Sequence, residues 1–249
     1  MPMALVTIAI ALYGWAPTAA RQEQVARFLR QGPRISANLM EDGGWGPEEG
    51  RISKLRRLIA ITPDDDSQKP DFWFRLGQAC GWHWHHSVDG HPFSREKRQA
   101  LFREAVNAYR AATLFPKYDR IDGALFELAR LHLAAGDLDS ARPYVDRLAR
   151  EHASSRYVPK VDLLYADQQV ARGERATALA WYSMAEQRAE ASTLPYAHYA
   201  KAWCFYARGD LDAGRFELAE AVRTADQASN WPWNRIVRRL AERDLGRAP

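Results

Sequence analysis

Apolar residues recur at helical spacing through most of the chain, in segments of helical length separated by short polar breaks. Three of these breaks are a glycine followed by an acidic residue, at Gly136-Asp137, Gly173-Glu174 and Gly209-Asp210, spaced 37 and 36 residues apart. Each lies between two amphipathic segments. Because a glycine just past a helix takes the left-handed conformation that lets the chain reverse, the pattern predicts three helical hairpins.

An earlier hairpin fits the same frame. Its marks are spaced as the tetratricopeptide (TPR) pattern W-x2-L-G followed by A-x3-Y-x2-A-x3-P: Trp73, Leu76, Gly77, Ala105, Tyr109, Ala112 and Pro116. An insertion near 85–97 separates its two halves, and a closing helix is predicted near 231–246. The predicted fold is all-α, a right-handed α-α superhelix of the TPR-like solenoid type over 69–249, with about four helix pairs plus the closing C-terminal helix.

The chain before this solenoid has a different pattern. Residues 3–15 are an apolar run followed by small residues up to Ala20, which predicts a signal peptide over 1–20. No Lys or Arg precedes the run, so an uncleaved anchor is the alternative. Residues 21–68 are predicted to hold N-terminal helices and a Gly/Pro-rich loop at 40–50. The last of these helices covers 51–61 and ends before Thr62-Pro63.

Two segments also resemble a known family. LRRLIAITPDDDSQKPDFWFRLGQ and YAHYAKAWCFYARGDLDAG are similar to bacterial cell-envelope TPR proteins of the adventurous gliding-motility kind, and the resemblance spans roughly 51–225. It implies a scaffold within a multi-protein envelope machine, or an envelope-maintenance module with peptidoglycan-linked or outer-membrane partners. His198 and Lys201 depart from the pattern, because these positions are usually apolar, and Gly214 replaces an expected alanine.

Composition narrows the class of protein without naming a partner. Hydrophobic residues make up 47% and charged residues 27% of the 249 positions, which excludes a disordered chain. The net charge of +4 owes much to arginines near the end of the chain: Arg235, Arg238, Arg239, Arg243 and Arg247. No recognition motif accompanies them, so we interpret them as a solvated helix face and expect no nucleic-acid partner. A peripheral association with a membrane stays open.

One cluster of metal-ligand residue types precedes and enters the insertion. Cys80, His83, His86 and His91 are of the kinds that bind zinc or copper, but their spacing is not a standard zinc spacing. The alternative, a histidine-rich helix end packed by Trp82 and Trp84, is preferred, and no cofactor is predicted. The chain has no nucleophile elbow, H-E-x-x-H motif, phosphate loop or dinucleotide fingerprint, so nothing indicates an enzyme.

The predicted binding surface is the concave groove of the solenoid, lined by the first helix of each pair. With the turn glycines as register, the groove positions are Phe74, Gln78, Trp82, Phe126, Arg130, Leu133, Lys160, Leu163, Asp167, Val170, Tyr196, Tyr199, Trp203 and Tyr206. The four aromatic residues of the last repeat share one helical stripe. This stripe either faces a ligand or is buried under the closing helix.

Together these patterns predict a non-catalytic scaffold. Its partner is expected to be a protein or peptide held in the groove, and its location the periplasm or cell envelope. A metal-binding protein that uses the Cys80–His91 cluster is the alternative from another class.

Overall fold

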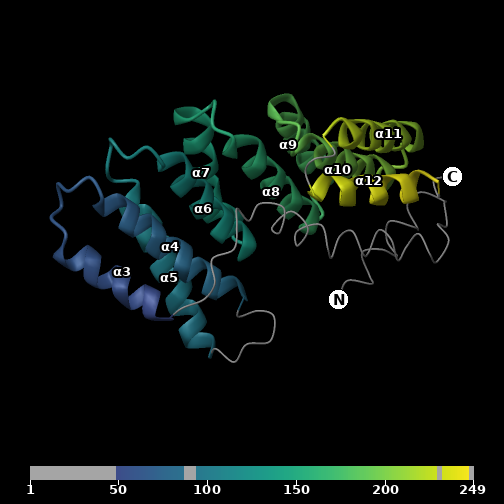
Figure 1. Ribbon diagram of the computed structural model, residues 1–249. Coiled ribbons are helices and arrows are strands. Elements are labelled where there is room, and N and C mark those ends of the chain that lie inside the picture. Colours follow the sequence, from purple (N-terminus) through teal and green to yellow (C-terminus); the bar gives the residue numbers. More distant parts are fainter. Residues whose placement is uncertain (1–48, 87–93, 229–231, 247–249) are drawn as a thin grey trace. The chain divides into compact units, whose positions relative to one another are not determined.

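The computed structural model describes residues 49–86, 94–228 and 232–246, and all its elements there are helices (Figure 1). In chain order they are α3 (Glu49–Ile61), α4 (Lys69–His86), α5 (Arg95–Ala112), α6 (Ile121–Ala134), α7 (Leu138–Glu151), α8 (Tyr157–Ala171), α9 (Arg175–Arg188), α10 (Leu194–Ala207), α11 (Leu211–Gln227) and α12 (Pro232–Leu245). The helices α4 to α11 form four pairs and α12 follows the last one. The predicted all-α, TPR-like helical-repeat class is confirmed.

The helices group into two compact units, and the boundary between them along the chain falls between Val158 and Pro159. The first unit holds α3 to α7 and the first residues of α8, and the second unit holds the rest of α8 and α9 to α12. The sequence placed one solenoid over 69–249 and did not indicate this boundary. The predicted signal peptide, residues 40–48 of the predicted loop and most of the insertion near 85–97 lie outside the described residues. Residues 49 and 50, predicted as loop, are the first two residues of α3.

The three Gly-acidic turns have the backbone that the sequence predicted. Gly136, Gly173 and Gly209 have φ values of 77°, 84° and 82°. In each turn the amide of the following acidic residue donates to the carbonyl five residues earlier, over 2.9, 2.9 and 3.0 Å. The glycine amide donates to the carbonyl three residues earlier. This is the Schellman arrangement, which satisfies the last carbonyls of one helix while the next one begins.

The core of the first unit is apolar and aromatic. Tyr109 on α5 is 1% exposed, and its ring lies edge-on to Phe74 of α4 at 5.5 Å between ring centroids. Gly77 makes room for the same ring, because a Cβ there would lie 2.8 Å from three of its atoms. The glycine of the TPR pattern is therefore required by packing against an aromatic ring of the paired helix.

The second unit packs α10 against α9, α11 and α12, and Figure 1 shows the last three helices side by side. Small residues allow this: Ala178 and Ala221 are 0% exposed, and Gly214 is buried. No helix in the described ranges is both long enough and apolar enough to cross a membrane.

Candidate partner-binding face

Helices α4 and α6 lie beside each other in the first unit and run in the same direction. A Cβ at Gly81 of α4 would lie 3.5 Å from Leu131 of α6, and one at Gly123 of α6 would lie 3.6 Å from Phe74 of α4. Gly123 and Phe74 lie near the starts of their helices, whereas Gly81 and Leu131 lie near the ends. The first helices of successive pairs are thus parallel neighbours, as a repeat stack requires.

Each of these two helices leaves one stripe at least partly exposed. On α4 the stripe is Arg75, Gln78 and Trp82, and on α6 it is Glu127, Arg130 and Ala134. The spacing of three and four residues keeps each set on one helix face. We call these six residues the α4–α6 face. The predicted groove residues Gln78, Trp82 and Arg130 belong to it.

The charges on this face are already paired. Arg130 donates to Glu127 through Nε at 2.9 Å and Nη2 at 2.7 Å, and the two side chains are 14% and 18% exposed. Arg75 donates through Nε to Asp71 at 2.6 Å, at a more exposed position. The Arg130–Glu127 pair is bidentate and partly desolvated, so both side chains are held in one orientation. A ligand can form further hydrogen bonds with this pair or replace one of its partners.

Two aromatic residues predicted to line the groove are core residues instead. Phe74 is 2% exposed, with the Arg120 guanidinium 4.0 Å from its ring centroid. Phe126 is 1% exposed and stacks on Tyr157 at 4.8 Å. On α6 the positions on either side of Arg130 were predicted one residue too early, because the more exposed stripe runs through Glu127, Arg130 and Ala134. Leu133, the last residue of the predicted α6 stripe, is also buried.

The third pair gives the same correction. Lys160 is half-buried, whereas Leu163, Asp167 and Val170 are buried. Asp167 accepts hydrogen bonds from the hydroxyls of Tyr182 on α9 and Tyr196 on α10. This carboxylate joins three helices in the interior of the second unit, so it is not a groove residue.

The aromatic stripe of the fourth pair is also largely internal. Tyr196, Tyr199 and Trp203 are 2%, 3% and 8% exposed, and Tyr206 is half-buried. Tyr199 donates to Asp244 of α12 at 2.9 Å. Of the two alternatives that the sequence left open, burial under the closing helix holds for Tyr199. Aromatic rings on a helix that is packed by three others are core, and their hydroxyls find buried acceptors.

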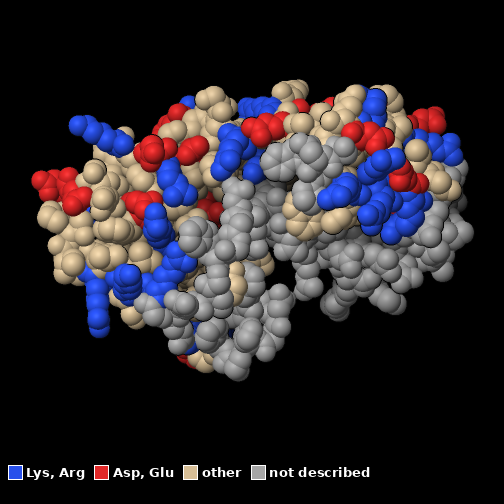
Figure 2. All heavy atoms as spheres, in the orientation of Figure 1, with Lys and Arg blue, Asp and Glu red and all other residues tan. Residues whose placement is uncertain are grey.

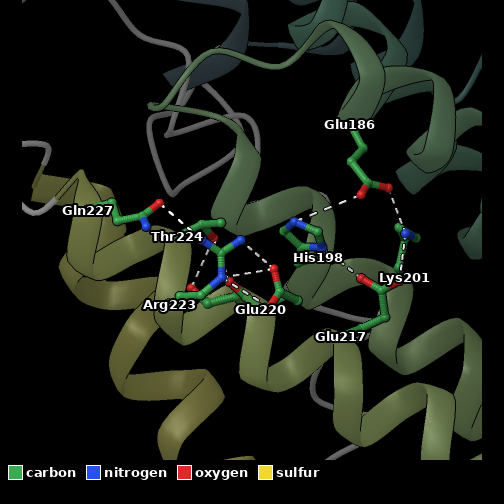
Figure 3. A network of polar contacts seen from close by, with 9 residues as sticks. Glu186, His198, Lys201, Glu217, Glu220, Arg223, Thr224 and Gln227 are labelled. Atoms are coloured by element: carbon green, nitrogen blue, oxygen red, sulfur yellow. Dashed lines mark hydrogen bonds and ion pairs between the residues drawn. The ribbon is translucent and has the colours of Figure 1, made fainter.

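His198 and Lys201, the two departures from the family pattern, belong to a buried polar cluster (Figure 3). His198 Nδ1 lies 2.7 Å from Glu217 of α11, and Lys201 Nζ lies 2.6 Å from both Glu217 and Glu186 of α9. Burial alone would raise the pKa of Glu217, but hydrogen bonds from His198 and Lys201 lower it. The sequence signal was present, because polar residues at core positions require polar partners.

Cys80 and His83, the two candidate metal ligands whose side chains the structure describes, are not part of a metal site. Cys80 is fully buried, and burial raises the pKa of its thiol to about 12, so it is not a thiolate at neutral pH. His83 is 8% exposed and lies edge-on to Trp82 at 5.3 Å between ring centroids. The side chain of His86 and the whole of His91 lie outside the described residues. Within the described ranges no three His, Cys, Asp or Glu side chains are grouped to hold a metal ion.

Comparisons with known proteins add little to this picture. No family model matches the chain, and no curated protein matches it. Among solved structures, a Rap protein complexed with competence and sporulation factor aligns with 12% sequence identity, over 91% of this chain and 67% of that chain, at a TM-score of 0.41. This score is too low for the likeness to carry an argument. By its own helix pairing the chain is an all-α protein of stacked helical repeats.

Proposed function

We propose that this chain is a non-catalytic scaffold that binds a partner protein or peptide through the α4–α6 face. The observation that carries the proposal is the pair of parallel first helices whose exposed stripes hold an indole, an amide and a fixed Arg–Glu pair. Aromatic and arginine side chains supply most of the energy at protein interfaces. The same positions in α8 and α10 are mostly buried, which restricts the proposed face to the first unit.

A selection from a random peptide display library against the folded full chain tests this proposal. The affinities of enriched peptides are then measured by fluorescence anisotropy on the wild type and on Gln78→Ala and Arg130→Ala. Truncating a residue at the centre of an interface weakens binding by about thirtyfold or more. Far-UV circular dichroism and denaturation confirm that each variant is folded.

The matched control is Arg142→Ala on α7, which removes an exposed arginine paired with Asp146 at 2.8 Å. We expect it to bind the selected peptides as the wild type does. If the library yields no binders, or if binders are insensitive to both Gln78→Ala and Arg130→Ala, the α4–α6 face is not the binding surface.

The finer part of the proposal places this scaffold in the cell envelope, within a machine of the gliding-motility kind or in envelope maintenance. Its support is the apolar run at 3–15 with small residues up to Ala20, and the family resemblance over 51–225. Amino-terminal sequencing of native protein tests export, and a mature chain that begins near Arg21 is expected. Native protein that is retained in the cytoplasm and still begins at Met1 or Pro2 would contradict it.

A further inference from the structure

A hollow of about 400 Å³ opens between α3, α4 and α5, on a part of the first unit that the groove prediction did not consider. Its lining residues are Arg56, Ile59, Trp73, Leu76, Ala100, Arg103, Glu104, Asn107 and Ala108. Two of the three helices that form it, α3 and α5, contribute nothing to the α4–α6 face. The hollow is therefore a separate surface, and its volume lies at the small end of the range of ligand-binding clefts.

Charge in this hollow is unevenly balanced. Arg56 donates to Glu104 through Nε at 2.7 Å and through Nη2 at 2.6 Å, so the two charges neutralise each other. This bidentate pair holds the guanidinium of Arg56 in one orientation, with its Nη1 group outside the pair. Arg103 is exposed one residue before Glu104, and within the described residues it makes no ion pair or hydrogen bond. The hollow thus keeps one uncompensated positive charge.

The surroundings of the hollow strengthen this charge. Helix α3 contains four basic residues and one acidic residue, Glu49, at its start. Three of the basic residues, Lys54, Arg56 and Arg57, are exposed, and Arg56 is the one paired with Glu104. Figure 2 shows Lys and Arg side chains gathered over the region where Figure 1 places α3. A positive field of this kind attracts an anionic ligand and weakens with added salt.

The rest of the hollow is lined by apolar side chains and by the carboxamide of Asn107. Trp73 is half-buried, and Ile59 and Leu76 are 8% and 2% exposed. Asn107 lies one helical turn after Arg103 on α5 and is exposed. An indole face beside aliphatic side chains takes an apolar group, and a carboxamide can both donate to and accept from a peptide bond. The hollow therefore combines sites for a negative charge, an apolar side chain and a backbone amide.

We propose that this hollow binds a partner segment in which an acidic side chain is followed by a large apolar one. The carboxylate contacts Arg103 and the outer edge of Arg56, and the apolar side chain packs on Trp73. Asn107 bonds to the backbone of the same segment. This is a second binding surface, and it does not depend on the α4–α6 face.

The test uses three fluorescein-labelled peptides on the full chain. The first alternates Asp with Leu, the second replaces each Asp by Asn, and the third replaces each Leu by Ser. The proposal expects the Asp–Leu peptide to bind at least tenfold more tightly than either of the others, and expects its binding to weaken as salt is added.

Two exposed arginines of α5 form a matched pair of variants. Arg103→Ala is expected to weaken the Asp–Leu peptide at least tenfold, whereas Arg110→Ala, which lies outside the hollow, changes binding less than twofold. Denaturation curves of both variants should overlay that of the wild type, because neither side chain is buried.

Several results would overturn the proposal. One is equal binding of the Asp–Leu and Asn–Leu peptides, and another is unchanged binding by Arg103→Ala. A third is complete displacement of the peptide by an adenine nucleotide, which would make the hollow a small-molecule site. Loss of binding in Arg130→Ala but not in Arg103→Ala would assign the peptide to the α4–α6 face, and would leave that proposed function standing while this inference fails.

Discussion

The two units of this chain are built from similar helix pairs but differ in what their interiors contain. In the first unit the core is mainly aliphatic and aromatic, Lys69 and His83 are its buried polar side chains, and ion pairs such as Arg56–Glu104 and Arg75–Asp71 lie at its surface. In the second unit charged and polar side chains enter the core itself. The buried ones are Asp162, Asp167, Gln169, Thr193, His198, Lys201, Glu217, Thr224, Asn234 and Asp244.

This difference teaches that one repeat pattern is stabilised in two ways. Apolar packing tolerates a change of partner as long as volume is kept, and it fixes helix positions through shape. Buried charges fix helix positions through specific pairs, and removing one partner leaves the other unpaired in a poorly solvating interior. We therefore expect the second unit to respond most strongly to loss of charge and the first to changes of volume.

The largest effect is expected from Glu217→Ala in the second unit. This carboxylate is bound by both His198 and Lys201, and all three residues are less than 9% exposed. Its removal leaves a buried lysine with only Glu186, so the free energy of unfolding should fall by about 3–5 kcal/mol. Chemical denaturation followed by circular dichroism measures the loss.

The control for this variant lies on the same helix. Glu220→Ala removes a carboxylate whose partner Arg223 is 54% exposed, and an exposed ion pair contributes about 0–1 kcal/mol. If the two variants lose equal stability, the buried cluster of α9, α10 and α11 contributes no more than a surface pair, and the contrast between the units is wrong.

The next effect depends on pH. Asp162 on α8 is fully buried, and this burial raises its pKa to about 6, although Arg188 at 3.2 Å acts in the opposite direction. In an unfolded chain an aspartate titrates near pH 4. From about pH 4 to about pH 6 the folded chain therefore holds a proton that the unfolded chain has lost, and wild-type stability falls as pH rises through this window.

Asp162→Asn cannot ionise and should escape this loss. Its free energy of unfolding relative to the wild type is expected to rise by on the order of 2–3 kcal/mol between pH 4 and pH 7. Denaturation curves at several pH values measure the difference. Asp146→Asn, at an exposed position on α7, serves as the control with little change. A gap between Asp162→Asn and the wild type that stays constant with pH would contradict the prediction.

A third prediction compares volume changes in the two units. A Cβ at Gly77 would lie 2.8 Å from the ring of Tyr109, which is fully buried and cannot move away. Gly77→Ala should cost about 1–2 kcal/mol even after the better helix propensity of alanine is counted. A Cβ at Gly214 would lie 2.6 Å from the ring of Tyr206, a residue that is less buried than Tyr109.

Because Tyr206 is less buried than Tyr109, its ring is expected to shift at a lower cost, and Gly214→Ala should change stability by less than about 1 kcal/mol. Thermal and chemical denaturation of the two variants measure both effects. A larger loss of stability in Gly214→Ala than in Gly77→Ala would mean that the second unit is packed as tightly as the first. Sensitivity to side-chain volume would then not distinguish the two units.

Turn chemistry is the part of the fold that the sequence predicted best. The Gly-acidic pairs require a positive φ at the glycine, and few other residues adopt it, so the register of the last three helix pairs follows directly. The TPR spacing around Trp73 and Gly77 placed the first pair in the same way. The boundary near Val158 was not predicted, because it interrupts neither the periodicity nor the turn pattern.

Exposure was harder to predict than helix position. Periodicity assigns residues to a face, but it does not say how many neighbours cover that face. Phe74, Phe126 and Tyr199 were assigned to a groove by register, yet each packs against an aromatic or polar partner of another helix. The hollow lined by Arg56 and Arg103 was missed because α3 and α5 are far apart in sequence and meet only in the folded unit.

The smallest predicted effect concerns a place where the two units are alike, the first turn of each second helix. Asp137 and Asp210 cap α7 and α11 by accepting from the amides of Ser140 at 3.0 Å and Ala213 at 3.2 Å. Glu174 stands at the same position of α9 and makes no such bond. Its backbone, with φ −84° and ψ 59°, is close to that of Asp210 at −84° and 84°.

A shorter carboxylate at this position should therefore reach the amide that glutamate does not bond. Glu174→Asp is expected to raise the free energy of unfolding by about 0.5–1 kcal/mol, and Asp137→Glu should lower it by a similar amount. Glu174→Gln, which keeps the longer side chain, is the control and should stay near the wild type. A paired result in these directions would show that turn capping acts alike in both units, so that the difference between them lies in their cores. If Glu174→Asp destabilises the chain, the turn before α9 is held by contacts of the glutamate itself, and the three repeats are less equivalent than their backbones indicate.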